Sequence, residues 1–344
     1  MTDADRVTSG EAFDGEVDFE QAIRPSTFDE FIGQEEVVHN LNVYIEAAQE
    51  RGEPVDHIIL SGPPGLGKTT LARMIANETD AEFHSTSGPI LEKAGDLAGI
   101  LTNLEFGDVL FIDEIHRLSH DVEEYLYSAM EDYEIDIIID SGPHARSVSL
   151  DLPQFTMIGA TTRMGLLTSA LRSRFGVREK IQYYPPEELK RIIKRAARIL
   201  DVEITDEAAR KISKRARGTP RVANRFLRRI RDLAQLESDN RISEEIAEEG
   251  LRMLDVDPHG LQETDRDILS ILVEHNGGPC GLKTISAAIG EEAGTIEQVH
   301  EPYLIRQGFL RKTSRGRELT RKGMEYMDMN PDDASSPLFS SSGE

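Results

Sequence analysis

Short apolar runs alternate with longer amphipathic segments in the first half of the chain. Runs at 57–60, 109–112 and 155–160 are rich in Ile, Leu, Val, Phe and Met. Helical patterns follow the first two runs, over 68–79 and up to residue 130. Short strands that alternate with helices are typical of a parallel sheet covered on both faces. The pattern therefore predicts an α/β fold.

A pair of β-rich runs interrupts this alternation before the third apolar run. Residues 135–139 and 147–152 lie on either side of a turn that contains Gly142 and Pro143. Two such runs around a Gly-Pro turn are typical of a β-hairpin. We expect this hairpin to extend from about 135 to 152. Its apolar residues are a mixture of core and candidate interface, namely Ile137, Ile139, Val148 and Leu150.

The second half of the chain changes character after the Tyr-Tyr-Pro-Pro segment at 183–186. From 187 to about 255 the sequence is helical with charged faces, which predicts a separate helical domain. Beyond Pro258, three short helical patterns precede two strands joined by a basic turn, an order typical of a winged helix. The predicted organisation is an acidic unstructured arm (1–22), an α/β domain (23–183), a helical domain (184–256), a winged helix (257–327) and an unstructured tail (328–344).

Charge is distributed unevenly along this acidic chain. Its 344 residues include 39 Lys and Arg against 63 Asp and Glu, a formal net charge of −24, which resembles the solvated surface of a halophile's protein. Two segments stand out against this background. Residues 187–231 hold 15 basic and 6 acidic side chains, and residues 306–322 hold 7 basic and 1 acidic. The second segment contains the turn of the predicted winged helix, which indicates a nucleic-acid contact there, with a solvated charged turn as the alternative.

The remaining composition excludes several classes of protein. The single cysteine, Cys280, has no partner for an internal disulfide, and no Cys and His residues have the spacing of a zinc finger. No apolar run approaches the length of a membrane span, and the first residues lack the pattern of a signal peptide. We therefore expect a soluble, cytoplasmic protein without a membrane partner.

The segment Gly62-Pro-Pro-Gly-Leu-Gly-Lys-Thr69 matches the phosphate-binding P-loop pattern. It lies between a predicted strand and a predicted helix, the context that this chemistry requires. The glycines, Gly65 and Gly67 among them, let backbone N–H groups turn toward phosphates. Lys68 is then expected to reach the β and γ phosphates, and Thr69 to bind Mg²⁺. The segment predicts ATP binding.

Two carboxylates end the second apolar run, at the edge of the sheet where ligands bind. Asp113 is expected to hold the Mg²⁺, and Glu114 to act as general base toward the attacking water. The alternative is a pair of solvated acids at the start of a helix. Beside the P-loop, the pair indicates hydrolysis. His116 and His120 are four residues apart, but with no third ligand we interpret them as ordinary polar residues.

Hydroxyl and guanidinium groups follow the third apolar run. Thr161 and its neighbour Thr162 lie at the same predicted edge, where a hydroxyl can orient water. The segment Leu171-Arg-Ser-Arg174-Phe175 offers two arginines, and an arginine placed on a neighbouring subunit's γ-phosphate would stabilise the transition state. Surface ion pairs are the alternative. Arg221 begins a basic helix and could reach the same nucleotide.

Together these motifs resemble the AAA+ ATPases, and within them the RuvB family of Holliday-junction branch-migration motors. The likeness runs from about Ile23 to Met327 and includes Phe28-Asp-Glu-Phe-Ile-Gly-Gln34, Leu110-Phe-Ile-Asp-Glu-Ile-His-Arg-Leu118 and Arg217-Gly-Thr-Pro-Arg221. It implies an α/β P-loop AAA+ core with a helical lid domain and a C-terminal winged-helix domain.

The resemblance also implies an activity and its partners. It points to an ATP hydrolase that moves double-stranded DNA at Holliday junctions during recombination and repair, as a hexameric ring loaded by RuvA and working beside RuvC. The hairpin 135–152 would dock on RuvA. Arg174 would be the finger acting in trans, Arg221 the lid sensor and Thr161 the sensor in the core.

Further site residues follow from the same resemblance. Beyond the P-loop glycines, Lys68, Thr69, Arg174 and Arg221, the nucleotide contacts would be Thr70, Ile23, Arg24, Glu131, Asp132, Tyr133 and Tyr184. DNA contacts would be Arg311, Lys312, Arg315 and Arg317. Lys312 stands where the family pattern leads us to expect Arg, which keeps the charge but loses a forked donor.

Two other classes of function compete with this interpretation. One is another AAA+ machine, a clamp loader or a protein remodeller. The other is a DNA-binding regulator that is switched by a nucleotide without turning it over. Glu114 and Arg174 argue against the regulator, because they are the groups expected to promote hydrolysis.

Overall fold

The computed structural model describes residues 21–138 and 147–330. The chain divides into two compact units. Among the described residues, one unit is 21–192 with Thr219–Arg221, and the other is Ile193–Gly218 with 222–330. Among the described residues, no helix is both long enough and apolar enough to span a membrane.

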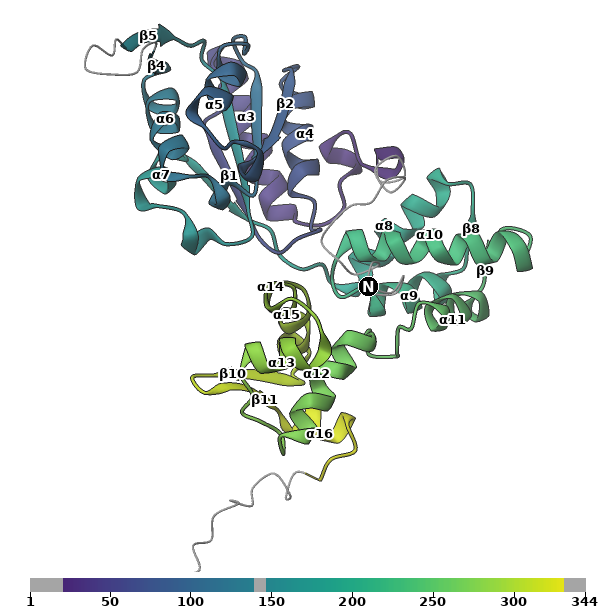
Figure 1. The fold of residues 1–344 in the computed structure, drawn as a ribbon. Helices are drawn as coiled ribbons and strands as arrows, with labels where there is room; N and C mark the ends of the chain where they lie inside the picture. The colour runs from purple at the N-terminus through teal and green to yellow at the C-terminus, as the bar shows by residue number, and fades with distance from the viewer. Residues whose placement is uncertain (1–20, 139–146, 331–344) are drawn as a thin grey trace, which may run out of the picture. The chain divides into compact units, whose positions relative to one another are not determined.

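A parallel five-stranded sheet forms the first unit, as the apolar runs predict (Figure 1). Its strand order is β2-β3-β6-β1-β7. Side chains of the central strands are buried on both faces, which explains why their sequences are continuous apolar runs. The strands are β1 (Ile58–Ser61), β2 (Phe83–Ser87), β3 (Val109–Asp113), β6 (Thr156–Thr161) and β7 (Val177–Lys180).

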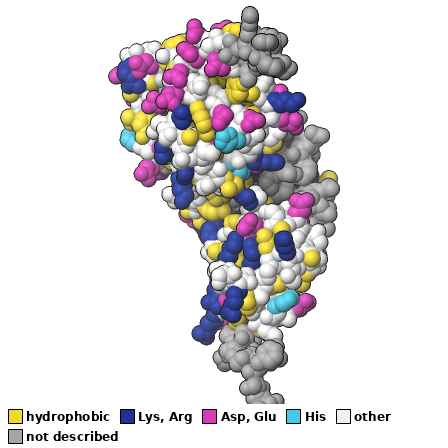
Figure 2. All heavy atoms as spheres, turned by 60° about the vertical axis from the view of Figure 1, so that its left-hand side comes forward, with side chains coloured by type: hydrophobic (Ala, Val, Ile, Leu, Met, Phe, Trp, Pro, Cys, Tyr) yellow, Lys and Arg dark blue, Asp and Glu magenta, His cyan; other side chains and the backbone are white. Residues whose placement is uncertain are grey.

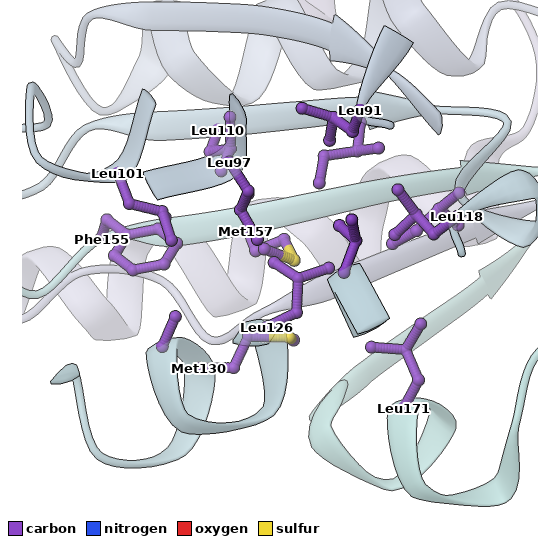
Figure 3. Close-up of a cluster of buried hydrophobic side chains, with 14 of the residues drawn as sticks. Leu91, Leu97, Leu101, Leu110, Leu118, Leu126, Met130, Phe155, Met157 and Leu171 are labelled. Carbon is purple, nitrogen blue, oxygen red and sulfur yellow. The ribbon is translucent and has the colours of Figure 1, made fainter. Parts of the chain in front are cut away.

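Helices cover both faces of this sheet. On one face, Leu97, Leu126 and Leu171 of three different helices pack with Leu110 and Met157 of the strands (Figure 3). The helices of that cluster are α5 (Ala94–Leu101), α6 (His120–Glu131) and α7 (Ser169–Arg174). The other long helices of the unit are α3 (Glu35–Arg51) and α4 (Lys68–Glu78), and its short 3-10 turns are η1 (Phe28–Glu30), η2 (Gly88–Ile90), η3 (Ile115–Arg117) and η4 (Met164–Leu166).

The predicted hairpin is present as an antiparallel pair, β4 (Glu134–Ile138) and β5 (Ser147–Asp151). Ile135 is buried and belongs to the core of the sheet domain, whereas Val148 and Leu150 are exposed. Ile139 and the turn with Gly142 and Pro143 lie outside the described residues.

A helical segment follows, as the charged amphipathic pattern predicts. It consists of α8 (Pro186–Ile199), α9 (Asp206–Arg215), α10 (Pro220–Glu237) and α11 (Glu244–Met253), with a short parallel pair, β8 (Glu203–Ile204) and β9 (Arg241–Ile242). Thr205 and Ser243 cap α9 and α11, because their side chains accept hydrogen bonds from backbone N–H groups of the first turn.

The C-terminal segment has the helices and the two-stranded wing expected of a winged helix. The elements are α12 (Glu263–Glu274), α13 (Leu282–Ile289), α14 (Ala293–Thr295), the π-helical η5 (Ile296–His300), α15 (Glu301–Gln307), β10 (Leu310–Thr313), β11 (Gly316–Leu319) and α16 (Arg321–Tyr326). Leu269, Ile285, Leu304 and Phe309 lie in its core. The wing pairs Lys312 with Arg317 across its two antiparallel strands.

Leu126 provides a test of the core on one face of the sheet. It is fully buried in α6, so Leu126→Ala leaves a cavity and should lower the free energy of unfolding by about 2–5 kcal/mol. Urea unfolding followed by circular dichroism measures the loss. Leu236→Ala is the matched control, because Leu236 is 86% exposed in α10 and its truncation should cost less than about 0.5 kcal/mol. Equal losses in the two variants would contradict this assignment of the core.

Candidate nucleotide site and nucleic-acid interface

The P-loop connects β1 to α4, where the sequence predicts it. Gly62, Gly65 and Gly67 all have positive φ, at 147°, 74° and 96°, a backbone conformation that L side chains rarely adopt. Gly67 caps α4 without any side-chain hydrogen bond, so the first N–H groups of the helix are not used by a cap. The loop has the backbone shape and the free helix end that phosphate binding requires.

Lys68 is held inside this loop. Its Nζ donates hydrogen bonds of 2.8 Å to the carbonyl oxygens of Gly62 and Pro63, and only 8% of the residue is exposed. Burial lowers the pKa of Lys68 to about 8, although the charges of Asp113 and Glu114 oppose this effect. An anionic ligand beside the ammonium group would favour its charged form.

The loop leaves no space for a side chain at Gly65. A Cβ atom there would lie 2.9 Å from Thr219 Cγ2 and 3.0 Å from Arg221 Cβ. The N–H group of Arg221 also donates to the carbonyl oxygen of Gly65 over 3.3 Å. The predicted lid sensor is therefore in contact with the loop. Thr69 and Thr70 follow in the first turn of α4, partly exposed.

Asp113 and Glu114 follow β3 at the same edge of the sheet. Asp113 Oδ1 accepts a hydrogen bond of 2.8 Å from the N–H of Glu114, whose φ of 47° is left-handed. This backbone conformation turns the chain sharply into η3. The Glu114 carboxylate forms an ion pair of 2.9 Å with Arg117, and both side chains are exposed to solvent. A carboxylate that is exposed in this way can exchange Arg117 for another partner at little cost.

Thr161 ends β6 beside these carboxylates. Parallel pairing places Ser61 opposite Thr161, and the N–H of Gly62 donates to the carbonyl oxygen of Thr161 over 3.1 Å. The Thr161 hydroxyl is buried, accepts a hydrogen bond of 3.0 Å from the N–H of Arg163, and lies 3.1 Å from His116 Nδ1. It therefore joins the turn after β3 to the end of β6.

The sequence did not lead us to expect the contact between His116 and Thr161. We interpreted it as an ordinary polar side chain, but it contacts the predicted sensor Thr161. Burial lowers its pKa, which favours the neutral ring at pH 7. Its position two residues after Glu114 was the available signal. His120 lies on the surface and pairs instead with Glu124 at 3.5 Å.

Tyr184 and Ile23 lie on the same compact unit as the P-loop. Tyr184 is 4% exposed, and its hydroxyl donates to the carbonyl oxygen of Leu66 over 3.5 Å. Burial raises the pKa of Tyr184, so the phenol stays neutral. Ile23 is buried, and Arg24 beside it is partly exposed.

Glu131, Asp132 and Tyr133 are not brought to this edge. The Tyr133 ring packs against His57 and Phe155, which precede β1 and β6, whereas the P-loop follows β1. Glu131 forms an ion pair of 2.7 Å with Arg174, whose guanidinium also lies over the Tyr127 ring. The structure therefore groups the predicted arginine finger with the end of α6, away from the P-loop of its own chain.

The wing presents three of the four predicted DNA contacts to solvent. Arg311, Lys312 and Arg315 are exposed, although Arg311 pairs with Glu318 and Lys312 with Glu297, each at 2.8 Å. Figure 2 shows Lys and Arg side chains close together on the surface of the winged-helix segment. Arg317 differs, because it is 7% exposed and forms a bidentate ion pair with Glu301.

The position of Thr161 leads to a test of the catalytic edge. Thr161→Val keeps the shape of the side chain but leaves the N–H of Arg163 and the His116 ring without their shared partner. We expect ATP hydrolysis to fall at least tenfold while ATP binding changes less than about threefold, since about 1.4 kcal/mol corresponds to a factor of ten. Steady-state hydrolysis and binding of a fluorescent nucleotide measure the two effects. Loss of hydrolysis in Thr162→Val alone would assign the sensor to the neighbouring hydroxyl.

Comparison with known proteins shows the family to which the chain belongs. Three family profiles match consecutive segments: the Holliday junction DNA helicase RuvB P-loop domain over residues 23–181, the RuvB AAA lid domain over 184–257 and the RuvB C-terminal winged helix domain over 258–328. The Holliday junction branch migration complex subunit RuvB of Salinibacter ruber is 56% identical over 323 residues, which cover 94% of each chain.

Solved structures give the same result. The RuvB Holliday junction branch migration motor of Thermotoga maritima is 50% identical, with a TM-score of 0.82, and the match covers 90% of this chain and 99% of that one. A mutant of the same Thermotoga protein matches at 51% identity and a TM-score of 0.83, with the same coverage. The matches extend over the P-loop domain, the lid domain and the winged-helix domain, and this chain belongs to the RuvB family of AAA+ ATPases.

Proposed function

We propose that this protein is an ATP-driven motor that moves double-stranded DNA at Holliday junctions. The observation that carries the proposal is the joint presence, in one chain, of a P-loop that meets Asp113, Glu114 and Thr161 at one sheet edge and of a winged helix with an exposed basic turn. The names of the Salinibacter and Thermotoga relatives support the choice of substrate. Membership of the RuvB family disfavours the clamp-loader and protein-remodelling alternatives.

Hydrolysis requires the groups at this edge to bind and orient ATP. The N–H groups of the P-loop and Lys68 would hold the phosphates, Thr69 and Asp113 would hold Mg²⁺, and Glu114 would accept the proton of the attacking water. Bound Mg²⁺ supplies positive charge that offsets the charge of the phosphates. Glu114 exchanges its exposed contact with Arg117 for the water, and Thr161 keeps the two loops in register.

The face formed by Glu131, Asp132, Tyr133 and Arg174 serves the nucleotide of a neighbouring subunit. These residues do not approach the P-loop of their own chain, so a role for them in nucleotide contact requires a second copy. A closed ring supplies one such copy to every site. We therefore propose a hexameric ring in which Arg174 stabilises the charge of the transition state in trans.

Mixed rings test this assignment. Glu114→Gln and Arg174→Ala should each lower ATP hydrolysis at least a hundredfold. If Arg174 acts in trans, an equal mixture of the two inactive variants contains intact sites, about one quarter of the total for random assembly, and should recover at least a tenth of wild-type activity. Hydrolysis assays after subunit exchange give the result.

An arginine that acts within its own subunit would leave the mixture inactive. Arg172→Ala is the comparison variant. Arg172 lies two residues before Arg174 in α7 and is also partly exposed. It should retain hydrolysis within about threefold. A larger loss in Arg172→Ala than in Arg174→Ala would exchange their roles.

The hairpin of β4 and β5 is the proposed docking surface for RuvA, with RuvC as a further partner at the junction. Val148 is 42% exposed and Leu150 36% exposed on β5, so apolar side chains are available there to a partner.

We also propose a division into three domains, with boundaries at about 183 and 256. The ends of the segments that the family profiles match, at 181 and 257, support these boundaries.

DNA contact is assigned to Arg311, Lys312 and Arg315, with Arg317 in a supporting role behind them. Because Arg317 is bound to Glu301 inside the domain, its charge is already used by the protein. Its guanidinium instead holds β11 against α15. Lysine and arginine at an exposed wing bind phosphates without reading bases, so binding should not depend on sequence.

Salt dependence tests the wing. Lys312→Ala and Arg315→Ala should each weaken binding to duplex DNA of any sequence and reduce the slope of log affinity against log salt by about 1. Fluorescence anisotropy across a salt series measures both effects. Arg321→Ala is the control, because Arg321 is 84% exposed in α16 and pairs with Glu325. An unchanged slope in both wing variants would remove the wing from the DNA interface.

A further inference from the structure

The loop between α9 and α10 carries two anchors that are four residues apart. At one end, Thr219 and Arg221 contact Gly65 of the P-loop. At the other end, the Arg217 side chain is buried among residues of the winged helix. Thr219–Arg221 belong to the compact unit of the P-loop, whereas Ile193–Gly218 and the residues from Val222 onward belong to the unit of the winged helix, so the chain passes from one unit to the other inside this loop. The loop therefore joins the unit that contains the P-loop to the unit that contains the winged helix.

Arg217 is bound from several directions. Its Nε donates to the carbonyl oxygen of Gly260 over 3.0 Å, and its NH2 donates to Gln262 Oε1 over 3.4 Å and to Asp265 Oδ2. Its guanidinium lies 4.8 Å from the centre of the Tyr303 ring. Its own carbonyl oxygen accepts a hydrogen bond from Arg306. These partners come from the segment before α12, from α12 itself and from α15.

Asp265 is the centre of this cluster. It is fully buried, and His300 Nδ1 lies 2.7 Å from its Oδ1 while the N–H of Gln262 donates to its Oδ2 over 2.9 Å. Burial alone would raise its pKa, but the charge of Arg217 and the hydrogen bonds outweigh that effect and lower the pKa to about 2. The carboxylate is thus charged at neutral pH, and Arg217 is the residue of the lid that compensates it.

The chain between the anchors is short and conformationally restricted. Gly218 has a left-handed φ of 72°, Arg217 has one of 57°, and Pro220 fixes its own φ. Four residues of fully extended chain span at most about 14 Å. This short loop can therefore absorb little of a displacement of Arg221, and Arg217 would move as well.

We propose that Arg217 is a positioning residue that fixes the winged helix to one end of the loop between α9 and α10. A movement of Arg221, at the other end of this loop, would then also move the winged helix. The inference rests on the proposed motor function. Arg217 touches neither ATP nor DNA in this role. It determines how far DNA is moved for each ATP hydrolysed. Without the contacts of Arg217, the lid could move while the winged helix did not.

Arg215 shows that the interaction is particular to Arg217. It lies two residues earlier and is also buried, but it pairs with Glu248 inside the lid. Lys211 contacts the same carboxylate at 2.9 Å, so Glu248 keeps a partner when Arg215 is removed. The backbone of Arg215 lies close to Gly260, but its side chain hydrogen-bonds to Glu248 within the lid. Arg215→Met is therefore a matched control that makes the same change of residue and leaves that backbone in place.

The experiment compares Arg217→Met/Asp265→Leu with wild type and with Arg215→Met. The double variant removes both members of the buried pair, because removing Arg217 alone would leave an uncompensated charge. Full-length protein is assayed for ATP hydrolysis and for dissociation of a synthetic four-way junction, in the presence of RuvA. The measured quantity is the number of junctions dissociated for each ATP hydrolysed.

We expect the double variant to hydrolyse ATP within about twofold of wild type and to dissociate at least tenfold fewer junctions for each ATP. Arg215→Met should keep the wild-type ratio within about twofold. If the double variant does not fold, Arg217→Lys is assayed in its place. It keeps the charge beside Asp265 but loses the forked contacts to Gly260 and Gln262. Its ratio should fall about threefold.

A wild-type ratio in the folded variants, or a parallel fall of hydrolysis and dissociation, would overturn the proposal, because either result describes a contact that only stabilises the fold. Wild-type protein that hydrolyses ATP without dissociating junctions would instead contradict the proposed function. The two failures are therefore distinguished by the wild-type arm of the same experiment.

Discussion

Parallel pairing of β1 with β6 and of β6 with β3 is the constraint on which the catalytic arrangement depends. Because the three strands run in one direction, their carboxyl ends meet at a single edge. The P-loop, Asp113 and Thr161 each continue from one of these ends. A shift in register would separate Ser61 from Thr161 and break the backbone hydrogen bond between Gly62 and Thr161. The close packing of helices on both faces of the sheet opposes such a shift, since each strand side chain would move to the opposite face and would not fit the packing there.

Buried ion pairs carry much of the specificity of the C-terminal segment. Arg217 with Asp265 and Arg317 with Glu301 are both desolvated pairs, and each joins elements that are distant in sequence. Such pairs add little to net stability but tolerate few other arrangements. In a chain with a net charge of −24, these two arginines are buried and do not add to the exposed cations of the surface.

The grouping of Arg174 with Glu131 has a consequence for regulation. If Arg174 acts in trans, as we propose, hydrolysis depends on assembly, because the transition state lacks that charge in a lone subunit. Within its own subunit the guanidinium is held by the ion pair with Glu131. Under this proposal, only the assembled form turns over ATP.

Sequence alone determined the fold class, the P-loop, the two carboxylates and the basic wing, because each depends on a local pattern. Apolar runs indicate buried strands, glycines indicate a turn, and acidic residues at the end of an apolar run indicate the edge of the sheet where ligands bind. Tertiary structure alone decided the contact of His116 with Thr161, the distance of Tyr133 from the P-loop and the burial of Arg217 and Arg317. An arginine has the same sequence signature whether it faces DNA, water or a buried carboxylate. Only packing with residues such as Asp265 and Glu301, far away along the chain, determines which of these partners it has.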